Sequence, residues 1–196
     1  MPSCIGCKCL AANGLLHFCD MSTSGPVRVF AALGSNMGDR WDALRRARSW
    51  LSRIADGQQL EASPIYETLP VGPGPQDCYL NQVVELRTTL DPEALLLFFK
   101  EVECWLGRRP RPRFHSREID IDLLFYGNQA VHTADLTVPH ERWAERSFVL
   151  VPLLDLVPDF SCPRSGRSAA ALLAENCPAW ESEVWSYQKE AAFCLN

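Results

Sequence analysis

The stretch between Gly107 and Leu124 combines residue types that bind phosphate with residue types that bind a hard metal ion. Two carboxylates, Asp120 and Asp122, are separated by one residue inside an apolar, strand-like run. Residues i and i+2 of a strand point to the same face, about 7 Å apart along the backbone. A divalent cation offsets the repulsion between two half-buried carboxylates, and Mg²⁺ uses one or two carboxylates together with phosphates and water. The pair is therefore a candidate Mg²⁺ site; the alternative is an exposed strand face with solvated aspartates.

Five arginines precede the pair and are candidates for binding phosphate. They are Arg108, Arg109, Arg111, Arg113 and Arg117. A planar guanidinium suits bidentate phosphate contacts, and Pro110 and Pro112 keep the segment out of helix and strand interiors. Such a loop could also be a solvated surface loop or a nucleic-acid patch. Because the net charge is −5 and no second basic patch of similar density occurs, a local polyphosphate clamp is favoured over a nucleic-acid track.

Composition narrows the class of protein. A chain of 196 residues, 47% of them hydrophobic, suffices for one domain with an ordinary core. No apolar run of about 18 residues occurs, so we expect no membrane span. The nine cysteines are scattered and odd in number, which argues against a disulfide framework and for a reduced, cytoplasmic setting.

The first 25 residues differ from the rest. Cys4, Cys7 and Cys9 could share a Zn²⁺ ion, although the usual second pair of cysteines is missing. The apolar stretch is too interrupted for a signal peptide. We expect residues 1–25 to be a disordered, Cys-rich extension with Met21 as a candidate functional start, residues 26–185 to form a single domain, and residues 186–196 to be a frayed tail.

The elements expected to position the charged residues follow the order β-α-β-β-α-β. Strands are predicted over 27–33, 59–66, 81–90 and from 119 onward, and helices over 39–54 and 92–106. Asp91 is a typical N-cap, with Pro92 at the first helical position. This order predicts an α+β fold with a ferredoxin-like core, an antiparallel sheet with helices on one face, plus C-terminal additions. A short hairpin after residue 128 and one helix over 168–185 are also predicted.

Six segments, taken in order, resemble a known enzyme family. They are 32–40 (ALGSNMGDR), 63–68 (SPIYET), 79–81 (YLN), 117–124 (REIDIDLL), 138–140 (VPH) and 146–153 (RSFVLVPL). Together they are similar to the 6-hydroxymethyl-7,8-dihydropterin pyrophosphokinases of folate biosynthesis, over about residues 27–160. The resemblance implies transfer of the terminal diphosphate of ATP to the hydroxymethyl group of a reduced pterin, with release of AMP.

The resemblance also implies roles for individual residues. Asp120 and Asp122 would hold two Mg²⁺ ions, and Arg108 and Arg117 would join them in catalysis. The ATP-binding residues would be Glu103, Arg108, Arg117, Leu123, Thr137, His140 and Arg146. The pterin-binding residues would be Thr68, Val71, Tyr79, Asn81, Phe114 and Phe148, with the ring stacked between Tyr79 and Phe148. The loops over 69–79 and 107–117 are candidate lids.

Some positions depart from the family pattern. Phe114, His115 and Ser116 stand where the family usually has an aromatic followed by small residues, and Glu141 stands where it often has an aromatic. The arginine loop is slightly shortened, so Arg109, Arg111 and Arg113 receive no role. The competing hypotheses are a ferredoxin-like nucleotidyl or phosphoryl transferase with another acceptor, and a nucleic-acid-binding module. We expect a monomer that acts on ATP and the pterin, without nucleic-acid or membrane partners.

Overall fold

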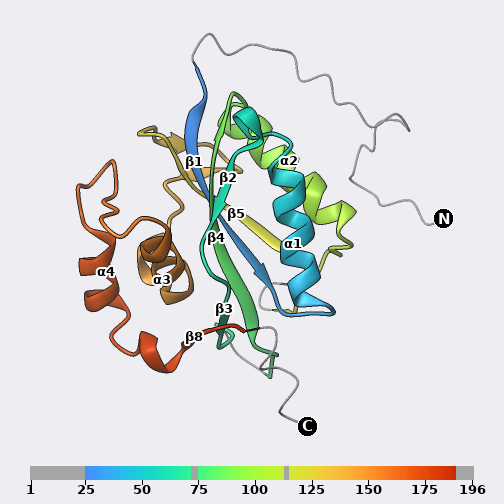
Figure 1. The fold of residues 1–196 in the computed structure, drawn as a ribbon, viewed down its shortest axis with the longest axis vertical. Coiled ribbons are helices and arrows are strands. Elements are labelled where there is room, and N and C mark those ends of the chain that lie inside the picture. Colours follow the sequence, from blue (N-terminus) through green and yellow to red (C-terminus); the bar gives the residue numbers. More distant parts are fainter. Residues whose placement is uncertain (1–24, 72–74, 113–114, 189–196) are drawn as a thin grey trace, which may run out of the picture.

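An antiparallel sheet forms the centre of the protein (Figure 1). The structure is a computed structural model that describes residues 25–71, 75–112 and 115–188. Its main sheet has the strand order β5-β1-β4-β3-β8, and β2 also pairs with β4. The strands are β1 (Val27–Ser35), β2 (Leu60–Ala62), β3 (Tyr66–Thr68), β4 (Tyr79–Thr88), β5 (Asp120–Tyr126) and β8 (Val184–Ser186). Neighbouring strands are all antiparallel.

Two helices cover one face of this sheet: α1 (Arg40–Leu51) and α2 (Pro92–Trp105). On α1, the buried side chains are Leu44, Ala47 and Leu51, whose spacing of three and four residues places them on one stripe of the helix. The carboxylate of Asp91 accepts the Ala94 N–H at 2.7 Å, which satisfies one of the unpaired amides at the start of α2. The βαββαβ order and the helices on one face confirm the predicted ferredoxin-like α+β core.

The C-terminal additions cover the opposite face with α3 (Ser147–Leu156) and α4 (Ala169–Asn176) (Figure 1). A second apolar cluster lies beneath them, and its aromatic rings are those of Phe30, Phe125, Trp143 and Phe160. A small two-stranded sheet, β6 (Val131–His132) and β7 (Thr137–Val138), confirms the predicted hairpin. Short 3₁₀ helices span Asp56–Gln58, Trp143–Glu145 and Trp180–Ser182.

Two sequence predictions differ from the structure. The strand predicted over 59–66 is interrupted at Ser63 and Pro64, so β2 and β3 are separate strands on β4. The single helix predicted over 168–185 is wrong, because α4 ends at Asn176, just before Cys177 and Pro178, and residues preceding proline disfavour the helical conformation. Strand β8 follows and pairs with β3, and the Tyr187 N–H donates to the Ile65 carbonyl. Backbone pairing therefore extends beyond residue 185.

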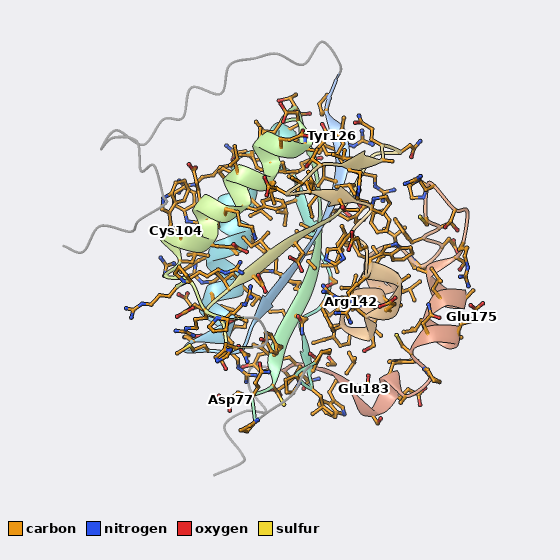
Figure 2. All side chains as sticks on the ribbon, turned by 180° about the vertical axis from the view of Figure 1, so that it is seen from behind. Asp77, Cys104, Tyr126, Arg142, Glu175 and Glu183 are labelled. Atoms are coloured by element: carbon orange, nitrogen blue, oxygen red, sulfur yellow. The ribbon has the colours of Figure 1, made fainter. Side chains whose placement is uncertain are left out.

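Several predictions lie outside the described residues. These concern the extension over 1–24 with Met21, the tail over 189–196, Arg113 and Phe114. Within the described ranges, four cysteines are free thiols, and one of them, Cys104, lies on the exposed side of α2 (Figure 2). No helix of the described part is long and apolar enough to cross a membrane.

Candidate active site

Strand β5 brings Asp120 and Asp122 to the wall of a cavity of about 330 Å³. In the sheet, Asp120 lies opposite Gly34 and Asp122 opposite Ala32, both on the neighbouring strand β1. The side chains of the two aspartates are 29% and 35% exposed. The carboxylates therefore open onto one shared space, as expected from the alternation of side chains along a strand.

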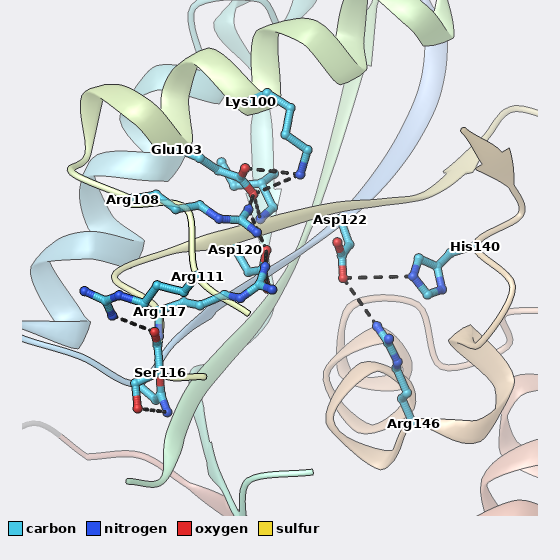
Figure 3. A network of polar contacts seen from close by, with 12 residues as sticks. Lys100, Glu103, Arg108, Arg111, Ser116, Arg117, Asp120, Asp122, His140 and Arg146 are labelled. Carbon is cyan, nitrogen blue, oxygen red and sulfur yellow. Dashed lines mark hydrogen bonds and ion pairs between the residues drawn. The ribbon is translucent and has the colours of Figure 1, made fainter. Parts of the chain in front are cut away.

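Three arginines from three segments converge on this carboxylate pair (Figure 3). Arg108, which follows α2, places Nη1 2.7 Å from Oδ1 of Asp120. Arg117, just before β5, places Nη1 3.2 Å from Oδ2 of Asp120. Arg146, at the start of α3, places Nη1 3.3 Å from Oδ2 of Asp122. Cations from both faces of the sheet thus meet at β5.

Glu103 organises the cations behind the cavity wall (Figure 3). Its side chain is only 2% exposed and accepts the Ile121 N–H at 2.8 Å, which ties α2 to β5. It pairs with Lys100 at 3.1 Å and with Arg108, and both of these cations line the cavity whereas Glu103 does not. Burial raises the pKa of the Glu103 carboxyl, and the charges of Lys100 and Arg108 oppose that shift. Glu103 therefore holds the side chains that face the cavity.

Burial shifts the pKa values of Asp120 and His140 in opposite directions. Burial, followed by the negative charge of Asp122, raises the pKa of Asp120, while Arg108 lowers it. Burial lowers the pKa of His140, although Asp122 opposes this shift. The Nδ1 atom of His140 accepts the Arg142 N–H at 3.1 Å, so a neutral ring carries its proton on Nε2, 4.0 Å from Oδ2 of Asp122.

The donor set fits a hard divalent cation. Asp120 and Asp122 lie on one cavity wall, and burial together with the charge of Asp122 raises the pKa of Asp120, so a cation bound between them would favour the ionised pair. Among the described residues, no group of three or more His, Cys, Asp or Glu side chains could hold a metal ion. Mg²⁺ does not need such a group, because it is typically held by one or two carboxylates plus phosphates and water.

The same cavity has an aromatic and amide-bearing side suited to a flat heterocycle. Tyr79, Phe148 and Val71 line it, together with the neighbouring pair of Asn81 and Thr68. Asn81 and Thr68 are 6% and 2% exposed, and the Asn81 amide donates to the Thr68 hydroxyl at 2.7 Å. This bond fixes the orientation of the amide and leaves further hydrogen-bonding capacity for a ring edge.

A second cavity of about 380 Å³ shares lining residues with the first. Leu123 and Thr137, two of the expected nucleotide-binding residues, line it, as does Glu141. Five residues line both cavities and so form the boundary between them: Lys100, Asp122, His140, Arg142 and Arg146. Asp122 and these four basic side chains thus border both the space suited to a heterocycle and a second space of similar size.

Sequence reasoning missed several residues of this site. Lys100 and Arg142 line both cavities, and Asn36 contacts the backbone of Arg117. A signal was available only for Lys100, since it lies three residues before Glu103 on a predicted helix and therefore on the same face. Arg142 is seen beside α3 in Figure 2. His115, noted as a departure from the family pattern, lines the first cavity.

Comparisons with known proteins show which family the chain is similar to. Residues 30–158 match the family model of 7,8-dihydro-6-hydroxymethylpterin-pyrophosphokinase. A 2-amino-4-hydroxy-6-hydroxymethyldihydropteridine pyrophosphokinase of Bacillus subtilis is 42% identical over 128 residues, which are 65% of this chain and 77% of that protein. The protein of the same name from Pseudomonas aeruginosa is 37% identical over 151 residues, covering 77% of this chain and 92% of the relative.

A solved structure shares the fold at low sequence identity. The Plasmodium falciparum HPPK-DHPS crystal structure with SDX-DHP superposes with a TM-score of 0.62 at 14% identity, covering 83% of this chain. This chain corresponds to 47% of the length of that longer one. The matched segment, residues 30–158, contains β5 with its carboxylate pair, the converging arginines and both aromatic residues of the cavity. The chain belongs to the 7,8-dihydro-6-hydroxymethylpterin-pyrophosphokinase family.

Proposed function

We propose that this protein transfers the terminal diphosphate of ATP to the hydroxymethyl group of 6-hydroxymethyl-7,8-dihydropterin, as a step of folate biosynthesis. The family and the names of its curated members support this reaction. The single observation in the structure that carries it is the position of Asp120 and Asp122. They line one cavity together with Tyr79, Phe148 and Asn81, and each forms an ion pair with an arginine that lines the same cavity.

The proposed reaction joins the hydroxymethyl oxygen of the pterin to the β-phosphorus of ATP. The bond between that phosphorus and the oxygen bridging to the α-phosphate breaks, AMP leaves with this oxygen, and the hydroxyl proton is lost to solvent or to phosphate oxygen. Such transfers need positioning and charge stabilisation more than covalent help from the protein. Arg108 and Arg117 are the proposed stabilisers of charge on the transferred diphosphate, and Arg146 and His140 would contact the nucleotide phosphates.

The pterin would be held by side chains already oriented in the cavity. Aromatic faces bind a flat ring through large apolar contact, and a few fixed polar groups select its edge. Tyr79 and Phe148 are the proposed stacking residues, and Asn81, Thr68 and the backbone near Val71 the proposed hydrogen-bonding groups. Burial raises the pKa of the Tyr79 phenol, so this ring stays neutral at physiological pH and adds no charge beside the pterin.

We further propose that Asp120 and Asp122 hold two Mg²⁺ ions. When bound, these ions would neutralise and orient the ATP phosphates. Leu123, Thr137 and Glu103 would complete the nucleotide site, with Glu103 acting through Lys100 and Arg108. We also propose that the protein is a cytoplasmic monomer without nucleic-acid partners; the acidic net charge of −5 supports the last of these three points.

The proposal is tested by measuring AMP release from ATP with the purified protein. We expect AMP only when both Mg²⁺ and the hydroxymethyl pterin are present. A pterin that lacks the hydroxymethyl group is the matched control, because it can bind but offers no acceptor oxygen. Equal AMP release with the control pterin, or none with the true substrate, would refute the proposed acceptor. Binding of single-stranded RNA at physiological salt would favour a nucleic-acid module instead.

A further inference from the structure

The backbone of Arg117 is hydrogen-bonded to a buried side chain from a turn that is distant in sequence. Asn36, which follows β1 and is 1% exposed, accepts the Arg117 N–H on Oδ1 at 2.7 Å. The Asn36 backbone N–H donates in turn to the Arg117 carbonyl at 3.1 Å. The Asn36 amide also donates to the Ser116 hydroxyl and to the Asp77 carbonyl, each at 3.3 Å. The position of Arg117 is therefore set through its main chain as well as its ion pair with Asp120.

Arg111 contacts the residues immediately before and after Arg117. Its Nη1 donates to the Ser116 carbonyl at 2.7 Å, and its Nη2 donates to Oε1 of Glu118 at 2.7 Å. Nη1 also lies 2.8 Å from the sulfur of Met37, in the same turn as Asn36. The two donors of one guanidinium thus reach the residues immediately before and after Arg117, a forked contact that lysine could not reproduce.

Glu118 depends on Arg111 for charge compensation. Its side chain is 22% exposed, and Arg111 is its ion-pair partner. Its second oxygen, Oε2, is buried without a hydrogen-bond partner among the described residues. Removing Arg111 would leave this half-buried carboxylate uncompensated next to Arg117, and a charge left without its partner drives local rearrangement.

Arg111 is also placed differently from the arginines of the cavity. Arg108, Arg117, Arg142 and Arg146 line the first cavity, whereas Arg111 lines neither of the two. Its guanidinium has its partners within the protein, so reaching a phosphate would require it to give up Glu118 and Ser116.

We propose that Arg111 is a positioning residue that, together with Glu118, fixes the main chain on either side of Arg117, and that it does not bind phosphate. This inference rests on the proposed function of Arg117 in diphosphate transfer. Arg111, which received no role from the sequence, would thus hold Arg117 in place.

A double-mutant cycle separates this role from phosphate binding. The variants are Arg111→Ala, Glu118→Ala and the double variant, with Arg109→Ala, an exposed neighbour in the same loop, as control. We expect each single change to lower kcat about tenfold while KM for ATP changes less than about twofold, because misplacing a charged group slows the chemical step. The double variant should be no worse than the singles, since both changes disrupt one unit. The control should keep wild-type kcat.

Other patterns overturn the inference. A large rise in KM for ATP in Arg111→Ala, with Glu118→Ala at wild-type kinetics, would identify a phosphate-binding residue. Additive losses, or no loss in either single variant, would show that the pair does not act as a unit. Thermal unfolding checks that the variants fold, and Arg111→Gln with Glu118→Gln replaces any alanine variant that does not.

A second measurement is independent of turnover. Amide hydrogen exchange at Arg117, whose N–H is bonded to Asn36, should accelerate in Arg111→Ala and in Glu118→Ala but not in Arg109→Ala. Unchanged exchange in both would overturn the inference. If the wild-type protein releases no AMP, the proposed function fails, and the exchange result still decides whether Arg111 positions Arg117.

Discussion

Asp120 and Asp122 are two residues apart on β5, yet different parts of the chain hold them. Asp120 pairs with Arg108 and Arg117, which flank the arginine loop, whereas Asp122 pairs with Arg146 at the start of α3. Each carboxylate therefore belongs to a separate ion-pair cluster, and the space between them is where a hard cation and phosphates would be accommodated.

Neutralising either carboxylate should abolish turnover without unfolding the protein. In Asp122→Asn the side chain keeps its shape but loses the charge for the metal, so we expect kcat to fall by at least about 100-fold. Asp120→Asn should behave in the same way. The fold should persist, because both residues are partly exposed and replacing one relieves their mutual repulsion. Steady-state AMP release and circular dichroism check the two halves of this prediction; near-normal rates would remove the aspartates from the metal site.

A methyl group at Gly34 should weaken pterin binding selectively. A Cβ at this position would lie 3.0 Å from the Asn81 Oδ1 atom and 3.8 Å from a ring carbon of Tyr79. In Gly34→Ala the Asn81 amide must shift, so we expect KM for the pterin to rise about tenfold, the equivalent of roughly one hydrogen bond. KM for ATP should change little. Gly25→Ala is the matched control, since its Cβ would meet nothing within 4 Å; equal effects of both variants would exclude this steric cause.

At the scale of elements, the sheet joins two helical layers with separate tasks. The layer of α1 and α2 supplies Lys100, Glu103 and the start of the arginine loop, and the α3 layer supplies Arg146 and Phe148. Strand β5 lies where contributions from both layers meet. Relative placement of the two layers therefore decides whether the cations converge on the carboxylates.

One contact between β3 and α3 gives a pH-dependent prediction. The Tyr66 hydroxyl donates to Asp155, and burial together with this bond raises the pKa of Tyr66 to about 12. Because the neutral phenol is favoured in the folded state, its contribution to stability is full below the unfolded pKa of about 10 and is lost as pH rises toward 12.

Replacing Tyr66 by phenylalanine should therefore lower the stability of the protein less at alkaline pH than at neutral pH. We expect Tyr66→Phe to lower the urea midpoint of unfolding at about pH 8 and to differ less from wild type at about pH 11. Tyr126→Phe is a comparison variant, because its hydroxyl donates to the Leu90 carbonyl instead of a carboxylate. The assigned direction of the pKa shift would be contradicted if the difference in urea midpoint between Tyr66→Phe and wild type grew from about pH 8 to about pH 11.

Elements with a local signal were predictable, and those defined by distant pairing were not. The strand and helix containing Val29 and Leu44 follow from regular apolar spacing, and the start of α2 follows from its Asp91 cap. Strand β8 has no comparable signal, because its pairing with β3 joins segments more than 110 residues apart in sequence. The same distinction holds in the site. The pairing of Asp120 and Asp122 was predictable because they share a strand, whereas the contact between Asn36 and Arg117 was not, because it joins residues 81 positions apart.

At the scale of the whole molecule, the described elements that build both cavities lie between β1 and α3. Residues 1–20 lie outside the described part of the chain. We therefore expect a variant lacking residues 1–20 to keep wild-type kcat, KM and thermal midpoint. Loss of folding or activity on this deletion would contradict the single-domain boundary at residue 26 and assign the Cys-rich segment a structural or catalytic role.

The most direct test of the central claim follows the phosphorus atoms. ATP labelled at its β-phosphate is supplied with Mg²⁺ and 6-hydroxymethyl-7,8-dihydropterin, and the products are separated. The account predicts unlabelled AMP and a labelled pterin diphosphate in equal amounts, both lost in Asp122→Asn. Labelled ADP together with a pterin monophosphate, or labelled free pyrophosphate with an unchanged pterin, would contradict diphosphate transfer by this site.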